Sequence, residues 1–347
     1  MKRYVSLLLV VAIILSLSGC GKSNTKKNNK KSGDKIQIGF TMDTFVMERW
    51  ERDRDIFLSK ANELGAEVNI QSANGDIEEQ KKQIRYFIEQ GVDVIVIVPI
   101  DCQGLTEEVK AAKDAGIKVI SYDRMIQNAS YDLYISFDNT MVGTLMGEAL
   151  RSAKPRNKNV IMVSGPTTDS NVIMVDDGFR SVIKNDDYNI VDITYIENWK
   201  QNLAYDYVNS NIDKVKEASV IMCGNDALAG QVIVALLERG IADQYIVLGQ
   251  DSDLDACQRI VEGTQYMTVY KPIDELATVG AESAVKLAKG EELEYTSTLN
   301  NGTNEINYIG INPYLVTKEN MDSVIIESGF HLKDEVYLNV KDEKKDE

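Results

Sequence analysis

From Lys35 onward, short runs of β-branched and other apolar residues alternate with longer stretches in which apolar residues recur at helical spacing. The run Val94–Val98 is apolar at every position, which is typical of a strand in a parallel sheet that is covered on both faces. Four runs in the first part of the chain are predicted to be strands: Ile36–Phe40, Glu67–Ser72, Val94–Val98 and Lys118–Tyr122. Strands that alternate with helices in this way predict an α/β fold with a doubly wound parallel sheet.

The same alternation is repeated in the second part of the chain. Helices are predicted over Asn139–Ser152 and Val172–Ile183, and strands over or near Val160–Ser164, Ile190–Ile196, Val220–Cys223, Ile246–Leu248 and Met267–Val269. A chain of 347 residues is long enough for two domains. We therefore expect two consecutive α/β units of similar size, which would form two lobes.

The first residues have the features of an export signal. Lys2 and Arg3 precede the apolar run Val5–Leu17, which is too short to span a bilayer and fits the core of a signal peptide. The segment that ends at Cys20 reads Leu-Ser-Gly-Cys and resembles the lipobox of bacterial lipoproteins. This resemblance implies that residues 1–19 are removed and that Cys20 is lipidated. The alternative is an ordinary signal peptide with an incidental cysteine.

Residues 20–35 are rich in lysine and asparagine and almost free of apolar side chains. Such a segment buries too little surface to fold, and it is predicted to be a flexible tether. The net charge of the whole chain is −16, which disfavours a nucleic-acid partner, because phosphate binding depends on clustered Lys and Arg.

The sequence offers little support for catalysis or for a metal site. His331 is the only histidine, and no phosphate-binding glycine loop is present, so we expect neither an enzyme nor a cofactor. The cysteines other than Cys20 are odd in number and lack metal-ligand spacing, and they are predicted to be buried: Cys102, Cys223 and Cys257. Acidic residues from Asp251 to Glu262 have the spacing of a calcium loop, but Ala256 stands where the turn needs glycine. No metal is therefore expected.

Polar and aromatic side chains follow nearly every predicted strand. Ligands of open α/β sheets bind beyond the carboxyl ends of the strands. The residues found there that we predict to bind a ligand are Arg49, Trp50, Asp123, Arg124, Asp169, Asn171, Trp199, Asn225, Asp251 and Lys271. Carboxylates, amides and guanidinium groups suit the hydroxyls of a sugar, and an indole suits its C–H faces. Trp199 is favoured for stacking, whereas Trp50 fits the apolar face of its helix equally well.

The charges in this set are balanced, with three basic and three acidic side chains. Buried charges persist only when they are paired, so a balanced set predicts a neutral ligand rather than an acid or a phosphate. For each charged residue taken alone, a surface salt bridge or a helix cap is an alternative role. Asp226, for example, could cap the helix that follows it.

Several segments together resemble the periplasmic sugar-binding proteins of ABC transporters, of the ribose- and xylose-binding type. The resemblance extends over Ile36–Leu332, and its best segments are ERWERDRDIF (48–57), QSANG (71–75), SYDRMI (121–126), YISFDN (134–139), GNDA (224–227), GQDSD (249–253), GTQYMTVYKPI (263–273), TLNNG (298–302) and GFH (329–331). It implies sugar contacts at Arg49, Arg124, Trp199, Asn225, Asp251 and Lys271, with Asp123 close by. Asn171 is our choice for the family's amide in the loop after Ser164, which is one residue longer than the family pattern.

The resemblance also implies a fold of the periplasmic-binding-protein type I, with two Rossmann-like lobes joined by three crossings near Asp138, Pro272 and Asn304. The first lobe would hold residues 36–138 and 272–303, the second lobe residues 139–271 and 304–333, and residues 334–347 would be a charged tail. The ligand would lie between lobes that close by a hinge motion.

The resemblance implies a function outside the cytoplasm. We expect a monomer, tethered to the membrane by the lipid on Cys20, that captures D-xylose or a related pentose and presents it to the permease of an ABC transporter. A sugar-sensing partner of a membrane histidine kinase is the alternative. A repressor that shares the two-lobe fold is excluded, because the signal peptide and tether occupy the place of a DNA-binding domain.

Overall fold

The computed structural model describes residues 35–45 and 48–340. The expected signal peptide, Cys20, the tether up to residue 34 and the last seven residues of the expected tail lie outside the described residues. No helix in the described ranges is long and apolar enough to cross a membrane.

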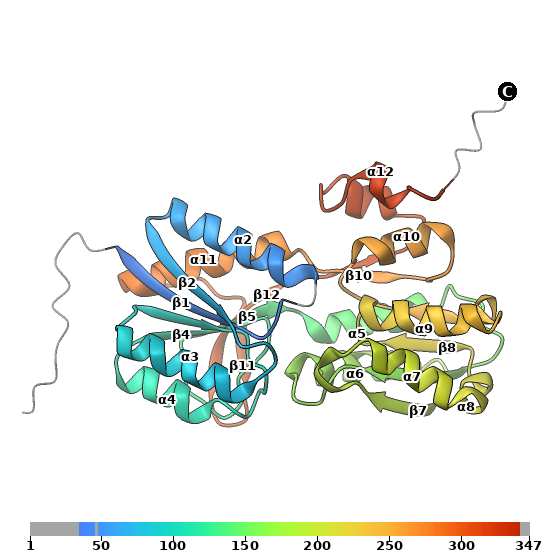
Figure 1. The fold of residues 1–347 in the computed structure, drawn as a ribbon, viewed down its shortest axis with the longest axis horizontal. Coiled ribbons are helices and arrows are strands. Elements are labelled where there is room, and N and C mark those ends of the chain that lie inside the picture. The colour runs from blue at the N-terminus through green and yellow to red at the C-terminus, as the bar shows by residue number, and fades with distance from the viewer. Residues whose placement is uncertain (1–34, 46–47, 341–347) are drawn as a thin grey trace, which may run out of the picture. The chain divides into compact units, whose positions relative to one another are not determined.

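The first lobe, defined as residues 35–137 and 273–311, is built on a seven-stranded sheet with the order β11-β12-β5-β4-β3-β1-β2 (Figure 1). All neighbouring strands pair in parallel except β11 and β12. The strands are β1 (Ile36–Met42), β2 (Ala66–Ser72), β3 (Val94–Ile97), β4 (Lys118–Tyr122), β5 (Leu133–Phe137), β11 (Ser297–Asn300) and β12 (Glu305–Ile311).

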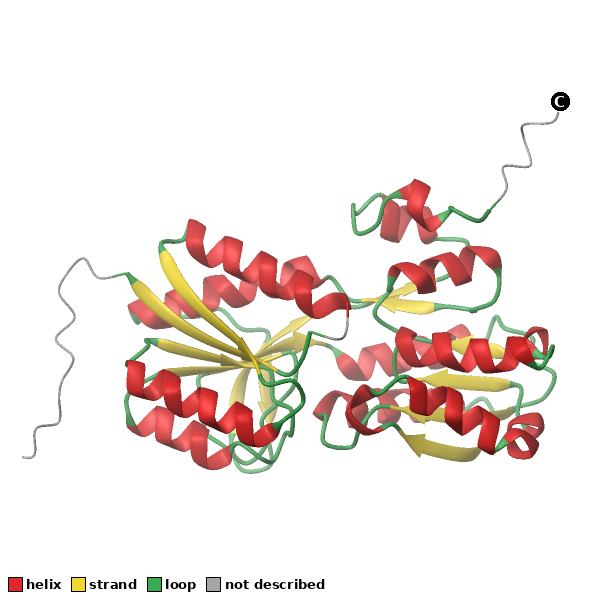
Figure 2. Cartoon of the chain, in the orientation of Figure 1, coloured by secondary structure: helices red, strands yellow, loops and turns green. Residues whose placement is uncertain are grey.

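Four long helices cover the two faces of this sheet (Figure 2). They are α2 (Glu48–Glu63), α3 (Ile77–Gln90), α4 (Thr106–Asp114) and α11 (Ile273–Lys289). Phe57 of α2 and Leu276 of α11 belong to the apolar core on one face, and Phe87 of α3 and Val109 of α4 belong to the core on the other. Both faces of the central strands are therefore buried, which explains why Val94–Ile97 is apolar throughout.

The second lobe, defined as residues 138–272 and 312–340, has a four-stranded parallel sheet with the order β7-β6-β8-β9. A separate antiparallel pair, β10 and β13, continues from this sheet through a bridge between Leu248 and Met267. The strands are β6 (Asn159–Ser164), β7 (Asn189–Tyr195), β8 (Val220–Cys223), β9 (Ile246–Leu248), β10 (Thr268–Tyr270) and β13 (Tyr314–Val316). The α-helices are α5 (Asn139–Ala149), α6 (Ser170–Ile183), α7 (Asn202–Ser210), α8 (Ile212–Glu217), α9 (Asp226–Glu238), α10 (Leu254–Glu262) and α12 (Lys333–Val336).

Glycines bring α5 and α6 into backbone contact on one face of the second sheet. A Cβ atom at Gly143 would lie 1.9 Å from the carbonyl oxygen of Val175, and one at Gly178 would lie 2.1 Å from that of Thr140. Only residues without a side chain permit this approach. The contact fixes the position of α6, whose N-terminus carries Asp169 and Asn171.

The prediction of doubly wound α/β units is confirmed, but the third crossing between the lobes lies later than expected. The chain passes between the sheets after Phe137, between Tyr270 and Ile273, and between Ile311 and Tyr314. The expected boundary near Asn304 is wrong, because residues 305–311 form β12, which pairs with β5 of the first sheet. Residues 304–311 thus belong to the first lobe.

The expected charged tail also begins too early. Residues 333–336 form α12, and Val336 is buried in an apolar cluster that includes Cys257 and Ile260 of α10. The side-chain amide of Gln258 donates a hydrogen bond of 2.9 Å to the carbonyl oxygen of Glu335. Residues 334–340 are therefore part of the second lobe as the structure describes it.

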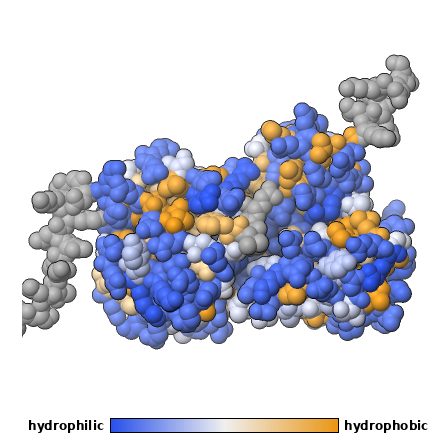
Figure 3. Space-filling model, in the orientation of Figure 1, coloured by the Kyte–Doolittle hydropathy of each residue, from blue (hydrophilic) through white to orange (hydrophobic). Residues whose placement is uncertain are grey.

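The face of the molecule in Figure 3 is mainly hydrophilic, in keeping with the 27% of charged residues in the chain. A small apolar patch lies over α9, where Val234 and Leu237 are 41% and 53% exposed. Patches of this size are normal on protein surfaces and carry no argument on their own.

Candidate functional site

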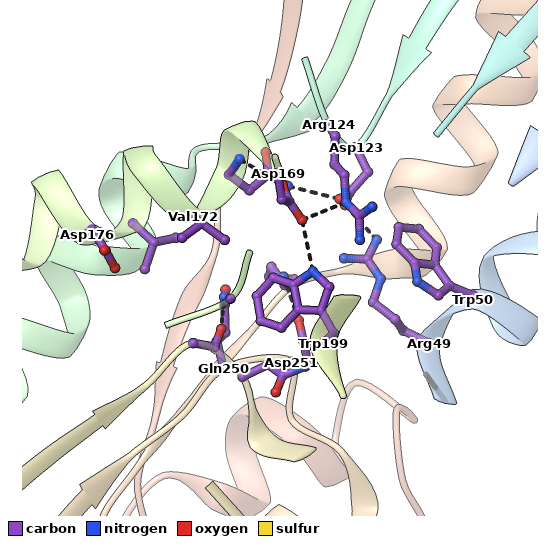
Figure 4. Close-up of a pocket in the computed structure, with 16 residues that line it drawn as sticks. Arg49, Trp50, Asp123, Arg124, Asp169, Val172, Asp176, Trp199, Gln250 and Asp251 are labelled. Atoms are coloured by element: carbon purple, nitrogen blue, oxygen red, sulfur yellow. Dashed lines mark hydrogen bonds and ion pairs between the residues drawn. The ribbon is translucent and has the colours of Figure 1, made fainter. Parts of the chain in front are cut away.

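Side chains from both lobes converge on one pocket beyond the carboxyl ends of the strands (Figure 4). All ten residues predicted to bind a ligand line it, together with six others: Gly165, Val172, Val175, Asp176, Gly224 and Gln250. Arg49, Trp50, Asp123 and Arg124 come from the first lobe, and the rest come from the second lobe. The structure thus brings together residues that are up to 222 positions apart, while their role in binding remains a prediction.

Arg124 follows β4 and connects the two lobes. Its Nη1 donates hydrogen bonds to the Asp43 carboxylate at 2.7 Å and to the carbonyl oxygen of Pro99 at 3.2 Å. Its Nε lies 2.7 Å from Oδ2 of Asp169 in the second lobe. Burial disfavours the charged form, but the carboxylates of Asp169, Asp43 and Asp123 raise the pKa of Arg124 above its ordinary value and so stabilise this buried cation.

Asp169 is the N-cap of α6 and accepts hydrogen bonds on both carboxylate oxygens. Oδ1 accepts from the backbone N–H of Asn171 at 2.9 Å, and Oδ2 accepts from the indole N–H of Trp199 at 3.2 Å. Burial raises the pKa of Asp169, and the positive charge of Arg124 acts in the opposite direction. The loop that departs in length from the family pattern thus places Asp169 and Asn171 on the pocket wall.

Trp199 forms an apolar wall of the pocket from the second lobe. It follows β7 in a short 3-10 turn in which both Asn198 and Trp199 have positive φ angles, of 51° and 55°. Its ring lies against the backbone of Gly165, where a Cβ atom would come within 2.2 Å of Cη2. The flat face available for a ligand therefore depends on a glycine at position 165.

Asp123 connects the lobes a second time. It has a φ angle of 65°, and its Oδ1 accepts a hydrogen bond of 3.0 Å from the Asn171 side-chain amide. Its Oδ2 lies 2.7 Å from Nη2 of Arg49, although the two groups are not aligned as a hydrogen bond. Burial alone would raise the pKa of this carboxyl, but Arg49, Lys271 and Arg124 together lower it. Asp123 is therefore held as a carboxylate.

Trp50 has two roles in the structure. It is 1% exposed and packs in the apolar core of the first lobe, yet it also lines the pocket. The guanidinium carbon of Arg49 lies 4.2 Å from the centroid of its ring, a distance typical of cation–π contact. Trp50 thus occupies both positions that the sequence left open, the apolar core and the pocket lining. In the view of Figure 4, the Arg49 side chain lies between the rings of Trp50 and Trp199.

Asp251, Lys271 and Asn225 form the floor of the pocket in the second lobe. Nζ of Lys271 lies 2.5 Å from Oδ1 of Asp251, whose backbone has a φ angle of 104°. Asn225 is the N-cap of α9, with its Oδ1 accepting from the N–H of Leu228 at 2.9 Å. Asp226 does not take the alternative role of helix cap, because its carboxylate instead accepts from the side chains of Gln265 and Thr268, which follow α10.

Most of the unsatisfied buried polar atoms of the described residues lie in this pocket. Eight buried side-chain nitrogen or oxygen atoms lack a hydrogen bond, and six of them belong to residues that line the pocket: Arg49 Nη2, Trp50 Nε1, Asp123 Oδ2, Asn171 Oδ1, Gln250 Oε1 and Asp251 Oδ1. Three of the six are in ion pairs instead, Arg49 Nη2 with Asp123 Oδ2 and Asp251 Oδ1 with Lys271. Native proteins satisfy nearly all buried polar groups, so such a cluster indicates a place for a ligand. It offers two donors and four acceptors, which suits a molecule with several hydroxyl groups.

Sequence reasoning missed two polar residues of the lining, Gln250 and Asp176. Gln250 directly precedes Asp251 at the end of β9, so its place at a strand end was a usable signal. Asp176 lies inside α6, where no sequence signal marks it, and burial raises its pKa. The charge balance was also incomplete, because the carboxylates of Asp43 and Asp53 stand behind the lining arginines. These additional acids make the site still less suited to an anion.

The sequence also singled out the cysteines, His331 and possible metal ligands. The three described cysteines are buried, as the sequence predicted, and make no disulfide. Nε2 of His331 lies 2.7 Å from the carbonyl oxygen of Ser252, outside the pocket lining. No cluster of three or more His, Cys, Asp or Glu side chains suited to a metal occurs among the described residues.

The fold and the pocket define a class of protein, and comparison with known proteins agrees. The family model for the periplasmic binding protein domain matches residues 38–292, and the chain belongs to this family. Two closely similar relatives can be named. The chain is 40% identical over 306 residues to the D-xylose-binding periplasmic protein of Escherichia coli, which covers 87% of this chain and 92% of that protein. It is 38% identical over 307 residues to the protein of the same description from Haemophilus influenzae, with the same coverage.

Solved structures give the same fold. A solute-binding protein of an ABC transporter from Clostridium phytofermentans, with bound β-D-glucose, is 27% identical and superposes with a TM-score of 0.76 over 86% of this chain and 99% of that chain. A carbohydrate transporter solute-binding protein from Chloroflexus aurantiacus, in complex with D-glucose, has a TM-score of 0.79 at 24% identity, over 87% of this chain and 98% of that chain. The architecture is that of the type I periplasmic binding proteins, as predicted.

Proposed function

We propose that this protein binds D-xylose, or a closely related pentose, in the pocket between its two lobes. The observation that carries the proposal is the cluster of six unsatisfied buried polar atoms on the pocket lining. The similarity to two D-xylose-binding proteins over most of the chain supports the choice of sugar.

The pocket has the groups that a neutral pyranose needs. Each sugar hydroxyl donates one hydrogen bond and accepts others, and charged partners make the stronger bonds. The Arg49 guanidinium and the carboxylates of Asp123 and Asp251 supply such partners. The ring of Trp199 supplies a face for the C–H groups. A phosphate or carboxylate ligand would meet an excess of buried acids and would bind poorly.

Capture of the sugar would require the lobes to move apart and together about the three crossings. Contacts that join the lobes next to the pocket support this mechanism: Arg124 pairs with Asp169, and Asn171 donates to Asp123. Such contacts would stabilise the closed form and would have to break when the lobes open. The closed, liganded monomer would then deliver its sugar to the permease of an ABC transporter.

The proposed location is the outer face of the cell membrane. The lipobox-like segment that ends at Cys20 supports a lipid anchor, and the polar tether would give the binding unit freedom above the membrane. Radiolabelled palmitate should be incorporated by the wild-type chain in cells and not by the Cys20→Ala variant. Equal labelling of both chains would remove the anchor from the proposal.

Titration calorimetry with a panel of sugars tests the binding function. The full chain in detergent is titrated with D-xylose, L-arabinose, D-ribose, D-glucose and the anion D-xylonate. We expect D-xylose to bind most tightly, D-xylonate to bind at least about 100-fold more weakly, and the sugar to be recovered unchanged, because the proposed role involves no chemistry. Absence of binding by every pentose, or a preference for the anion, would refute the proposal.

A further inference from the structure

Asp53 is a buried carboxylate directly behind the pocket. It lies one turn after Arg49 on α2, is 0% exposed, and is not among the described residues that line the pocket. A buried carboxylate is costly unless its charge is compensated, so its presence in an otherwise apolar core requires a reason.

Both oxygens of Asp53 hold elements of the pocket wall. Oδ2 accepts a hydrogen bond of 3.2 Å from Nε of Arg49. Oδ1 accepts one of 2.6 Å from the hydroxyl of Tyr122, the last residue of β4 and the neighbour of Asp123. One carboxylate thus connects the helix that carries Arg49 to the strand that carries Asp123.

The Arg49 guanidinium lines the pocket between two carboxylates. Nε faces Asp53, whereas Nη2 faces Asp123 without forming an aligned hydrogen bond. The flat guanidinium also lies over the ring of Trp50, which limits its rotation. Asp123 is the nearer counter-ion of Arg49, at 2.7 Å from Nη2, and Asp53 holds Nε from the other side at 3.2 Å. Without the negative charge of Asp53, the guanidinium would be drawn further toward Asp123, and both groups would be less available to the ligand.

We infer that Asp53 is a positioning residue for sugar binding, which in its charged form orients the Arg49 guanidinium toward the ligand and whose protonation weakens ligand affinity. The inference rests on the proposed function and adds a regulation by acid. Burial raises the pKa of Asp53 to about 6, while Arg49 and Tyr122 act against this rise. The carboxyl therefore changes charge within a range of pH that cells encounter.

The ionisable groups that face Asp53 are few. Arg49 comes from its own helix, Tyr122 is the last residue of β4, and Asp123 directly follows that strand. The acids of α11, which packs against α2, do not face Asp53: Asp274 pairs with Arg52, Glu282 pairs with Lys60, and Glu275 is exposed. The titration of Asp53 is thus governed by groups of the binding site itself.

The test compares the D-xylose affinity of the full chain and of its Asp53→Asn variant from pH 5 to pH 8 by calorimetry. Binding that requires the charged form of a group with a pKa near 6 should be about tenfold weaker at pH 5 than at pH 7.5 in the wild type. Asp53→Asn should bind at least about tenfold more weakly at pH 7.5, with an affinity that no longer depends on pH in this range. If the role of Asp53 were purely structural, Asp53→Asn would have a lower melting temperature, but its affinity would depend on pH as that of the wild type does.

A second variant keeps the test decisive if Asp53→Asn does not fold. Tyr122→Phe keeps the charge of Asp53 but removes the hydroxyl that lowers its pKa, so the midpoint of the affinity profile should move to higher pH. An unmoved midpoint, or an Asp53→Asn variant with wild-type affinity and pH profile, would overturn the inference and leave the proposed function intact. A wild-type chain that binds no pentose at any pH would overturn both.

Discussion

Arg124 Nε and Asp169 Oδ2 lie 2.7 Å apart, and this ion pair joins the end of β4 in the first lobe to the N-terminus of α6 in the second. Both side chains are only 3% exposed. A buried pair of this kind contributes to structure only while both partners are present, because either partner alone is an uncompensated charge.

Replacement of Arg124 by alanine should therefore weaken binding strongly. The carboxylates of Asp43 and Asp169 would be left buried without their cation, and we expect a loss of at least about 2 kcal/mol in the free energy of D-xylose binding. Titration calorimetry measures this loss. Arg151→Ala is the control, since that arginine is 52% exposed and pairs with Asp186 at the surface. Equal affinities of both variants and the wild type would remove Arg124 from the site.

Asp251→Ala should have an effect of similar size by a different route. It removes an acceptor from the pocket and leaves the Lys271 ammonium without its partner at 2.5 Å. We expect a loss of at least about 2 kcal/mol in binding free energy, measured by calorimetry. Asp255→Ala, an exposed acid of α10, should bind like the wild type. A wild-type result for Asp251→Ala would show that the carboxylate does not touch the sugar.

Substitutions of the two tryptophans should affect different quantities, D-xylose affinity for Trp199 and the free energy of unfolding for Trp50. Trp199→Ala removes a partly buried pocket wall and should reduce D-xylose affinity more than Trp50→Ala does. Trp50→Ala creates a cavity in the first core and should cost about 3–5 kcal/mol of unfolding free energy. Calorimetry and urea denaturation of both variants measure the two quantities. The reverse order of affinities would mean that Trp50 provides the stacking face.

Gly165→Ala tests the contact between the Trp199 ring and the backbone on which it lies. The added Cβ would lie 2.2 Å from the Trp199 ring, so the indole must move, and we expect at least a tenfold loss of affinity by calorimetry, about 1.4 kcal/mol. Gly230→Ala is the control, because its Cβ meets only the flexible end of Arg259 at 3.1 Å. Unchanged affinity in Gly165→Ala would indicate that the position of the ring does not matter.

Two buried carboxyls predict how stability depends on pH. Burial raises the pKa of Asp226 to about 7 and that of Asp53 to about 6, from an ordinary value of 3.8. Above pH 4 the folded state therefore holds protons that the unfolded state has lost, so the stability that these groups contribute declines as the pH rises through 6 and 7. The unfolding free energy of the ligand-free chain should fall by about 4 kcal/mol between pH 5 and pH 8. Urea denaturation at several pH values measures it, and a maximum at pH 8 would contradict the assignment.

Local patterns in the sequence were sufficient to predict the central strands of both sheets. The apolar runs at Val94–Ile97 and Val220–Cys223 became fully buried strands, because a strand covered on both faces has no position for a polar side chain. The convergence of ten dispersed residues was also predictable, since parallel strands present their carboxyl ends at one edge of a sheet.

Elements that depend on distant partners were not predictable in this way. β11 is mostly exposed, and β12 joins the first sheet only by pairing with β5, which precedes it by about 170 residues. α12 is identified by one buried side chain, Val336, rather than by a periodic pattern. The sequence by itself determined the two α/β units and the set of polar residues at their strand ends. The tertiary structure decided the third crossing, the unsatisfied atoms of the pocket and the position of Asp53 behind Arg49, because each depends on side chains that meet only after the sheets have formed.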